Sequence, residues 1–415
     1  MSQGRFPGGV TALGVAAMKR RPAPLRALAF AGALLLGALP AGAQKAPPPA
    51  FTLTALPPQP AGVPFPGETW PRGELGAGVD GAALRTQVEG AFGGKFPELG
   101  QTRAVVIVQG GRIVLERYAP DFDATTPQVS WSMAKSVTGA LVALALRDGI
   151  IKSLDEPLAL EAWPEGDPRR TITFRQALAM ADGLNWREFN ADPVNDDAAR
   201  MLFGEGRENV IRYAAAKRLA HEPGARWNYS TGTSHLIGQA LRERFWARNP
   251  NDLTAGTDPF RDFMREELFL KIGMESAAPE FDRAGAFYAG SLIYATPQDW
   301  ARFGLLYLRG GRWGDEQVIP PELVALARTP SGGAGAEDYG HHWWINAAGT
   351  GLMGDRGPRD SFEAHGFQGQ VVAVVPSKDL VVVRMGIMPD GAWPALGAWM
   401  QGVVGAFPDA PPANL

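Results

Sequence analysis

The stretch AVVIVQGGRIVLERY, from Ala104 to Tyr118, decides the fold class of this 415-residue chain. Two runs rich in β-branched residues flank the pair Gly110-Gly111, and this pattern is typical of a β-hairpin. Two further runs, QVVAVVP and LVVVRMG, lie near the other end of the chain and are joined through residues 376–379. Strands at both ends with helical patterns between them predict an α+β protein. We expect one antiparallel sheet built from both chain ends, flanked by helices, with a mostly helical inserted region.

Helical patterns fill the middle of the chain. The segment from about 158 to 280 is mostly helical by pattern and is broken by turns. Thr296 is followed directly by Pro297 and three residues later by Asp299, which is the sequence signature of a helix start. A last helix is expected from about Trp393.

The N-terminal residues 1–43 have the three parts of a secretory signal peptide. A basic segment, MKRRPAPLR, begins at Met18, an apolar segment, ALAFAGALLLGALP, follows it, and the small residues AGA precede Gln44. Met18 opens a better-proportioned signal than Met1 and is the alternative start. Because the apolar part is short for a bilayer span, we expect an exported protein, periplasmic or secreted, and an uncleaved anchor is the alternative.

Composition shifts divide the remainder of the chain into three parts. Residues 44–70 are rich in proline and are expected to form an extended lead-in without a core of its own. Residues 71–406 have a globular pattern without a fixed-period repeat. Residues 407–415 form a short tail. The sequence therefore predicts one globular domain behind a signal and a linker.

Composition also excludes several classes of function. The chain has 45% hydrophobic and 20% charged residues and a net charge of −3, so it lacks the basic character of a nucleic-acid or polybasic membrane protein. It contains no cysteine, which rules out disulfides, thiol catalysis and cysteine-ligated metal. Its five histidines show no ligand spacing, and His341-His342, on an expected strand, would point apart. We expect no metal and no organic cofactor.

A serine and a lysine share the start of an apolar helix in VSWSMAKSVTGALVALALRDG, from Val129 to Gly149. Ser132 and Lys135 are three residues apart, so the hydroxyl and the amine lie on one helical face and can touch. A serine hydroxyl needs a base to become a nucleophile, and a lysine amine can serve if burial or a neighbouring cation lowers its pKa. The pair is therefore either a nucleophile with its activator or ordinary polar decoration.

Two later stretches supply candidate partners for this pair. In PGARWNYSTGTSHLIG, Tyr229 precedes an apolar helical pattern and could relay a proton between nucleophile and leaving group. A structural tyrosine with its ring in the core is the alternative. In EAHGFQGQVVAVVP, glycines at a strand start allow close backbone approach, and free N–H groups there could complete an oxyanion hole with the N–H of Ser132. An ordinary glycine-rich turn is the alternative.

In this order and at these separations, WSMAKSVTGALV, YSTGTS and HGFQGQVVAVVPSKDLVVV resemble the motifs of the serine β-lactamase-related hydrolases. That superfamily includes class C β-lactamases, DD-peptidases, esterases and 6-aminohexanoate-dimer hydrolases. The last branch is the most similar in style, because GGRIVLERYAPDFDATTP and MADGLNW also fit it. The resemblance covers about Trp70 to Val404 and implies a β-lactamase/transpeptidase-like fold.

The resemblance implies a role for each matching residue. Ser132 would be the acylated nucleophile and Lys135 its basic partner. Tyr229 would be general base and acid, its proton affinity lowered by Lys135. The backbone N–H groups of Ser132 and Phe367 would form the oxyanion hole.

Two departures from the family pattern affect substrate binding. Thr231 stands where the family's Y-x-N motif has asparagine, which alters one expected contact to a substrate amide. The K-T-G motif aligns best as Ala364-His365-Gly366, so the lysine that would meet the carboxylate of a β-lactam or D-alanine is absent. Because adjacent strand residues face opposite ways, His365 is expected to neighbour the site and not to replace the lysine.

We therefore expect a serine hydrolase that cleaves a small ester or amide through an acyl-enzyme on Ser132. A β-lactamase or D-alanyl-D-alanine peptidase is the alternative, and a catalytically inactive, penicillin-binding-like protein is the alternative of another class. Asp182 in MADGLNW could meet a substrate amine or simply form a turn with Gly183. The expected partner is a small molecule, with no nucleic acid and no stable membrane insertion after signal cleavage.

Overall fold

The computed structural model describes residues 52–409, apart from 190–191, 249–257 and 333–334. The expected signal peptide, the first part of the lead-in and most of the tail lie outside the described residues. Among the helices in these ranges, none is both long and apolar enough to cross a membrane. Nor do the same ranges contain a group of three or more histidines and carboxylates that could hold a metal ion.

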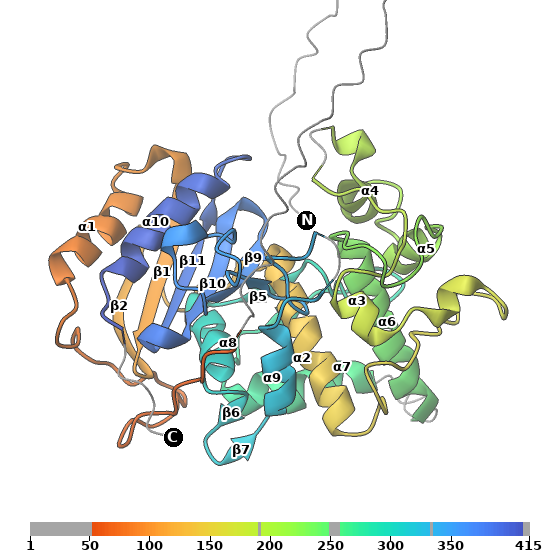
Figure 1. The fold of residues 1–415 in the computed structure, drawn as a ribbon, viewed down its shortest axis with the longest axis horizontal. Helices are drawn as coiled ribbons and strands as arrows, with labels where there is room; N and C mark the ends of the chain where they lie inside the picture. The colour runs from red at the N-terminus through yellow and green to blue at the C-terminus, as the bar shows by residue number, and fades with distance from the viewer. Residues whose placement is uncertain (1–51, 190–191, 249–257, 333–334, 410–415) are drawn as a thin grey trace, which may run out of the picture. The chain divides into compact units, whose positions relative to one another are not determined.

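A six-stranded antiparallel sheet joins the two ends of the chain, as the sequence predicts (Figure 1). The early hairpin turns at Gly110 and Gly111, which both have positive φ, and its first strand pairs with the last strand of the chain. The expected α+β architecture is confirmed. In spatial order the strands are β2 (Arg112–Tyr118), β1 (Gln101–Gln109), β11 (Leu380–Ile387), β10 (Gln370–Val375), β9 (Phe362–Gly366) and β8 (Trp344–Ile345).

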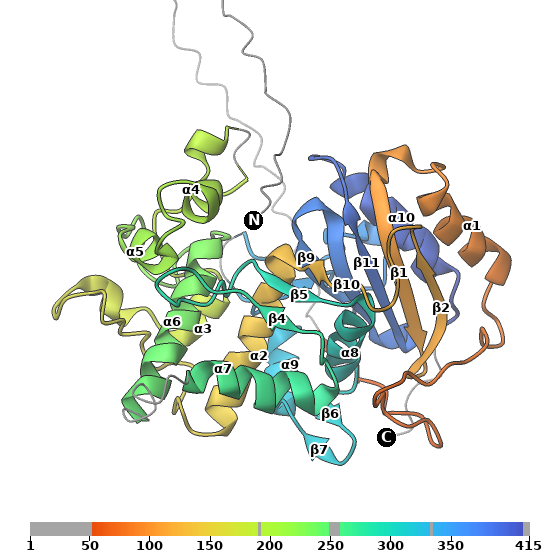
Figure 2. The same cartoon turned by 180° about the vertical axis from the view of Figure 1, so that it is seen from behind.

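The sheet buries both faces, because side chains alternate along each strand. Val105 and Ile107 of β1 pack under α1 (Gly81–Phe92) and α10 (Trp393–Gly405), whereas Val106 joins the larger core on the other face. That core includes α2 (Ala134–Arg147) and α8 (Pro297–Leu308), as Figures 1 and 2 show from opposite sides. The remaining helices are α3 (Phe174–Leu178), α4 (Asp197–Phe203), α5 (Val210–Ala215), α6 (Thr231–Arg248), α7 (Pro259–Met264) and α9 (Pro321–Ala327).

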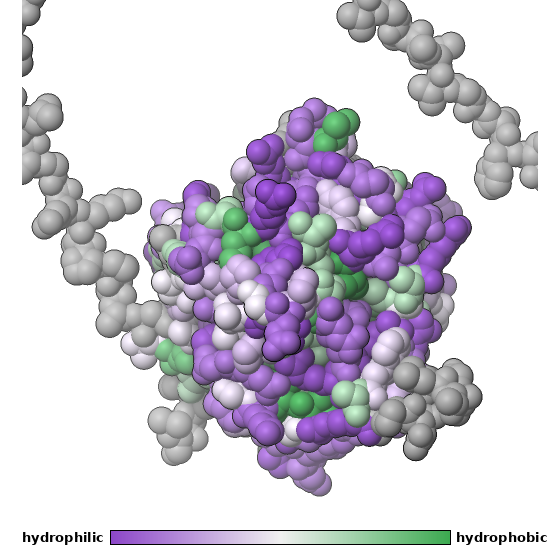
Figure 3. Space-filling model, turned by 90° about the vertical axis from the view of Figure 1, so that its right-hand side faces the viewer, coloured by the Kyte–Doolittle hydropathy of each residue, from purple (hydrophilic) through white to green (hydrophobic). Residues whose placement is uncertain are grey.

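Helices α3 to α7 form the inserted helical region beside the sheet (Figure 1). The side of the domain that they present is mostly hydrophilic, and its apolar residues lie in small separate areas (Figure 3). The helices therefore turn their polar sides outward and their apolar stripes toward the shared core.

Short strands connect the serine segment to the inserted region. β3 (Gln128–Val129) pairs with β5 (Ile293–Ala295), which in turn pairs with β4 (Ala278–Pro279). A separate two-stranded ribbon is formed by β6 (Arg312–Trp313) and β7 (Glu316–Gln317). Because β3 ends just before the serine, the chain that leads into β5 is held close to the start of α2.

The expected capping of α8 is confirmed, since the Thr296 side chain accepts a hydrogen bond from the Asp299 N–H. The expectation that His341 and His342 lie on a strand is wrong. Both precede β8, and the chain turns at His342, where φ is 64°. The ring of His342 is held by the Leu178 carbonyl and a serine hydroxyl, so hydrogen bonding places it inside the protein.

The described part of the lead-in, residues 52–70, forms no helix or strand but lies against the domain. Buried Arg309 donates to the Gln59 side chain and the Pro57 carbonyl, and Arg328 donates to the Thr54 carbonyl. These bonds supply two buried guanidinium groups with backbone and amide acceptors from the lead-in, although Arg309 Nη2 and Arg328 Nε have no hydrogen-bond partner among the described residues. The extended lead-in thus completes the packing of the domain.

Candidate active site

Ser132 lies in a 3-10 turn, Trp131–Met133, immediately before α2. The preceding Ser130 is fixed to the β5 segment, where its N–H donates to the Ile293 carbonyl and its hydroxyl accepts from the Ile293 N–H. Trp131 has a φ of 46°, a left-handed conformation that non-glycine residues adopt mainly at constrained sites. This fixed and turned backbone presents the half-buried Ser132 at the helix N-terminus.

Lys135 lies on the first turn of α2, where it is almost completely buried, and its amine contacts Ser132. The Nζ to Ser132 Oγ distance is 2.9 Å, and Nζ also donates to Thr231 Oγ1 at 2.8 Å and to the Gly290 carbonyl at 2.9 Å. Burial lowers the pKa of Lys135 to about 8, although the nearby Glu188 carboxylate opposes this shift. The amine therefore loses its proton close to neutral pH, as a base for Ser132 requires.

Tyr229 precedes α6 and reaches Ser132 from the inserted region. Its hydroxyl hydrogen-bonds with the Ser132 side chain, and its ring lies with its centroid 4.8 Å from the Lys135 amine. Burial, together with Glu188, raises the pKa of Tyr229 well above its ordinary value. The resemblance implies that Lys135 lowers the proton affinity of Tyr229, but burial acts in the opposite direction, because desolvation disfavours a buried phenolate. The pKa shifts therefore favour a protonated Tyr229 beside a partly neutral Lys135.

Glu188 is a member of this group that sequence reasoning missed. Its carboxylate accepts hydrogen bonds from the Thr231 N–H and from the Thr231 hydroxyl, both at 2.7 Å. It also accepts from Trp186 Nε1 at 2.7 Å. Thr231 therefore lies between the Lys135 amine and the Glu188 carboxylate and contacts both. No spacing rule in the stretch LNWREFN would have identified this glutamate.

The end of β9 approaches the serine segment closely, as the glycine motif predicts. A Cβ atom on Gly366 would lie only 2.1 Å from the Ser130 carbonyl oxygen, so only glycine fits there without displacing backbone. The next residue, Phe367, packs edge-on against Trp131 with ring centroids 5.6 Å apart. The structure thus brings the two segments that carry the proposed oxyanion N–H groups, those of Ser132 and Phe367, together.

The two residues before Gly366 face opposite sides of the sheet. Ala364 is 1% exposed and belongs to the core beside α2, and its methyl side chain carries no charge that could replace the lysine. His365 stacks on Trp344, whose ring in turn stacks on Tyr229, with centroid distances of 5.4 Å in both cases. Burial lowers the pKa of His365 to about 3. His365 is therefore a neutral neighbour behind Trp344 and does not replace the missing lysine.

Asp182 is buried and its carboxylate is already occupied. It accepts from the Thr233 hydroxyl at 2.5 Å and from the Leu184 N–H at 2.9 Å. Asp182 thus forms the turn that was the alternative to substrate binding, and it also bonds to Thr233 at the start of α6. The structure does not bring Asp182 into contact with Ser132, Lys135 or Tyr229 through any of these bonds.

Aromatic side chains surround the group. Trp131 packs between Phe367 and Phe203 of α4, and those two phenylalanines are 48% and 62% exposed. On the other side, Phe189 stacks on the Tyr229 ring. Single exposed aromatics are ordinary, but several around the half-buried Ser132 mark an apolar approach to its hydroxyl.

Comparison with known proteins identifies the family. The family model named Beta-lactamase matches residues 96–386, well over half of the chain, and the chain therefore belongs to this family. The resemblance to the serine β-lactamase-related hydrolases is confirmed. No curated protein matches the sequence.

Solved structures share the fold at low sequence identity. A Bacillus anthracis protein named as a 6-aminohexanoate-dimer hydrolase homologue has a TM-score of 0.63 at 19% identity, over 86% of this chain and 90% of that one. EstCE1, a hydrolase with promiscuous acyltransferase activity, has a TM-score of 0.57 at 16% identity, over 78% and 98%. A class C β-lactamase from Rhodobacter sphaeroides has a TM-score of 0.52 at 16% identity, over 77% and 99%. At these identities the similarity concerns the fold alone.

Proposed function

We propose that this protein is a serine hydrolase that cleaves a neutral ester or amide through an acyl-enzyme on Ser132. One observation carries the proposal: a buried lysine amine of lowered pKa lies 2.9 Å from the hydroxyl of a serine at a helix N-terminus. A serine beside a base that is partly neutral at physiological pH is an activated nucleophile.

The proposed acylation begins when neutral Lys135 accepts the Ser132 proton as Oγ attacks the carbonyl carbon. The oxyanion is stabilised by the N–H groups of Ser132 and Phe367. The bond to the leaving group breaks as the leaving atom takes the Tyr229 proton, which leaves a phenolate and a lysine ammonium. Because the pKa of Tyr229 is raised and that of Lys135 is lowered, the proton passes back to Tyr229. Water then attacks the acyl-enzyme while Lys135 takes its proton. As the acyl C–O bond breaks, Lys135 returns that proton to Ser132 Oγ, which releases the carboxylic acid and regenerates the serine.

The surroundings of Ser132 favour a neutral, apolar substrate. Among the residues that the structure describes, the one cation in contact with Ser132 is Lys135, which has three hydrogen-bond partners within the protein. Ala364 supplies no second cation for a substrate carboxylate. The exposed rings of Phe203 and Phe367 instead offer apolar area to an acyl or leaving group. These features support esters or amides without a carboxylate over β-lactams and D-alanyl peptides.

The test combines a fluorophosphonate probe with p-nitrophenyl butyrate. We expect one phosphonyl adduct per chain, mapped to Ser132, and steady release of nitrophenol that the probe abolishes. Ser132→Ala should lose both while keeping its circular dichroism spectrum. Folded protein without an adduct would favour the inactive binding protein, and rapid nitrocefin hydrolysis would favour a β-lactamase.

We also propose that the protein is exported. The proposal rests on the basic, apolar and small-residue segments before Gln44, which lie outside the described residues. Intact mass of the protein recovered from its native host should show a mature chain beginning at Gln44. A chain that keeps the apolar segment would support the anchor instead.

A further inference from the structure

The single hydroxyl proton of Thr231 is donated to Glu188. Thr231 Oγ1 donates to Glu188 Oε1 at 2.7 Å, because a carboxylate oxygen can only accept. The same Oγ1 lies 2.8 Å from Lys135 Nζ, so in that contact it must accept. Glu188 therefore determines in which direction the Thr231 hydroxyl points.

The Gly290 carbonyl occupies a second position around the lysine nitrogen. Like the oriented Thr231 hydroxyl, it can only accept, and it lies 2.9 Å from Nζ. Neutral lysine has two hydrogens and one lone pair. With both hydrogens donated to these two acceptors, the lone pair is left for Ser132 Oγ at 2.9 Å. This is the arrangement in which the amine can take the serine proton without first rotating.

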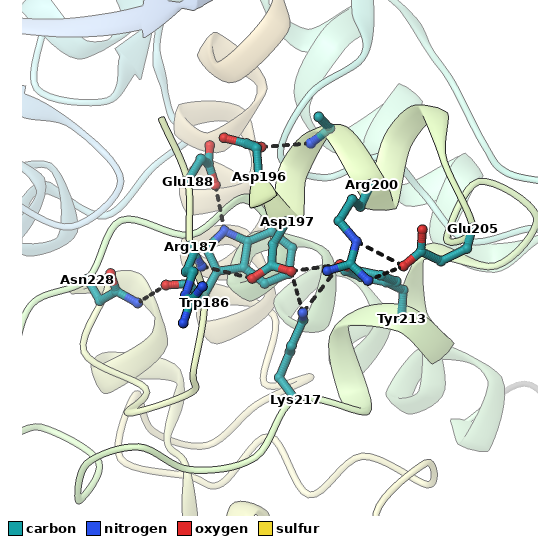
Figure 4. Close-up of polar contacts among 11 residues, drawn as sticks. Trp186, Arg187, Glu188, Asp196, Asp197, Arg200, Glu205, Tyr213, Lys217 and Asn228 are labelled. Atoms are coloured by element: carbon teal, nitrogen blue, oxygen red, sulfur yellow. Dashed lines mark hydrogen bonds and ion pairs between the residues drawn. The ribbon is translucent and has the colours of Figure 1, made fainter. Parts of the chain in front are cut away.

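Glu188 is itself held in place by the segment around it. Its second oxygen accepts from the Thr231 N–H and from Trp186 Nε1. Figure 4 shows the bonds that fix this segment: the Asn228 side chain donates to the Trp186 carbonyl, and Asp197 accepts from the Arg187 N–H at 2.9 Å. The half-buried Glu188 carboxylate therefore has three donors that together fix its orientation.

The start of α6 is shaped to receive this segment. A Cβ atom on Gly232 would lie 2.5 Å from the Trp186 ring, so the glycine that follows Thr231 lets the indole lie against the helix. Asp197, which holds the neighbouring backbone, also accepts from the Tyr213 hydroxyl at 2.7 Å and pairs with Lys217. The contacts extend from α5 to the lysine through residues that do not touch Ser132.

We propose that Glu188, acting through Thr231, is a positioning residue that directs the lone pair of Lys135 toward Ser132. The inference rests on the proposed role of Lys135 as the base. The other titratable side chains near Lys135 are Tyr229, whose pKa burial raises, and His235 and His342, for which burial lowers the pKa to about 3. Burial keeps these three in their neutral forms, so the group that acts electrostatically on the amine is the Glu188 carboxylate.

The decisive variant is Glu188→Gln. If its oxygen keeps the two N–H donors, its NH2 group faces Thr231 Oγ1 and donates to it, so the Thr231 proton turns toward Lys135 and competes for the lone pair. We expect the fluorophosphonate rate of the folded variant to fall about 10- to 100-fold at the high-pH plateau. The midpoint of its pH profile should move to lower pH, because the carboxylate that raises the Lys135 pKa is gone. Glu205→Gln, which removes only an exposed ion pair with Arg200, is the matched control.

A double-mutant cycle with Thr231→Val separates positioning from general loss of structure. Without the threonine hydroxyl, Glu188 has no hydrogen-bonded route to the amine and acts on it only through its charge. At the high-pH plateau, where the amine is neutral in either case, adding Glu188→Gln to Thr231→Val should therefore cost less than twofold. Full additivity of the two losses, or a Glu188→Gln profile like that of the parent, would overturn the inference. The proposed function fails separately, if the parent protein itself is not labelled at Ser132.

Discussion

At Lys135, the burial that removes water from the amine also makes the amine a base. Its pKa lies near 8, below the ordinary value of 10.5, so the neutral fraction grows as pH rises through 8. We predict that the rate of Ser132 phosphonylation increases with pH from 6.5 and levels off above 9. Stopped-time labelling across this range measures the profile.

Lys135→Met provides the control for that profile, since it keeps an apolar stem but has no amine. We expect it to lose at least about 100-fold in labelling rate at every pH. A rate that falls with rising pH, or one that is unchanged in this variant, would show that another group accepts the serine proton.

Tyr229 is predicted to act on the leaving group, because its raised pKa keeps the hydroxyl protonated. Tyr229→Phe should therefore slow hydrolysis of ethyl butyrate, whose alkoxide must be protonated, about 10- to 100-fold more than that of p-nitrophenyl butyrate. Steady-state kcat/KM for the two esters measures the ratio. Equal losses on both esters would instead assign the hydroxyl to activation of Ser132.

Some properties of these side chains could be predicted from the sequence and others could not. Ser132, Lys135 and Tyr229 could be predicted because ordered motifs carry their chemistry in residue type and spacing. The direction of the Tyr229 pKa could not, since it depends on burial by rings from distant segments. Glu188 could not be predicted either, because its bond to Thr231 spans 43 positions and exists only in the folded chain.

Among the structural elements, the contact between the end of β9 and the serine turn leaves no space for a side chain at Gly366. Gly366→Ala places a methyl group 2.1 Å from the Ser130 carbonyl, which must push the strand end away. We predict a folded protein with kcat/KM for p-nitrophenyl butyrate lowered by about 100-fold, as expected for misplaced oxyanion donors. Gly405→Ala at the end of α10 meets no atom within 4 Å and should leave kcat/KM unchanged. Normal activity of Gly366→Ala would mean that the second donor lies elsewhere.

Phe203 and Phe367 both pack against Trp131 and expose apolar ring surface near Ser132. We therefore predict a preference for longer acyl groups. Each buried methylene of a substrate is worth about 0.8 kcal/mol, so kcat/KM should rise with acyl length while these rings cover the chain. Phe203→Ala should flatten the slope from acetate to octanoate p-nitrophenyl esters and leave the acetate value nearly unchanged. A steep slope that survives this substitution would place the acyl group on another side of Ser132.

Elements with strong periodicity were predictable and short ones were not. The hairpin at Gly110-Gly111, the capped α8 and the terminal α10 follow local rules of turn, cap and apolar stripe. By contrast, β8 is only two residues long, and His342 leaves the strand pattern because its ring bonds the Leu178 carbonyl. That bond joins residues far apart in the chain and depends on tertiary packing, so no local sequence pattern predicts it.

Across the whole domain, one antiparallel sheet built from both chain ends could be predicted from the apolar runs. The direct pairing of β1 with β11 could not, because each of these strands also has a hairpin neighbour, β2 or β10, as a partner. The same packing buries titratable groups, and this has a consequence for stability. Burial lowers the pKa of His235, His342 and His365 to about 3 and that of His341 to about 4. The opposite case is Glu363, whose pKa burial raises to about 8.

These shifts predict that the domain loses stability on mild acidification. Between about pH 4 and 6.5 the unfolded chain binds protons at these four histidines that the folded chain does not, and each adds a slope of up to about 1.4 kcal/mol per pH unit. Glu363 opposes them, since stability from its protonated form is lost as pH rises from 4.5 to 8. Burial also raises the pKa of Asp182, Glu243, Asp338 and Asp379, and these carboxyl groups oppose the histidines in the same direction. We expect the four histidines to dominate between pH 7 and 5, because Glu363 is the one carboxyl of this set whose pKa reaches about 8. Urea unfolding at pH 7, 6 and 5 should therefore show a falling free energy of unfolding. His342→Gln should reduce the slope and the exposed His221→Gln should not, whereas a flat or rising stability toward pH 5 would refute the predicted neutral burial of these rings.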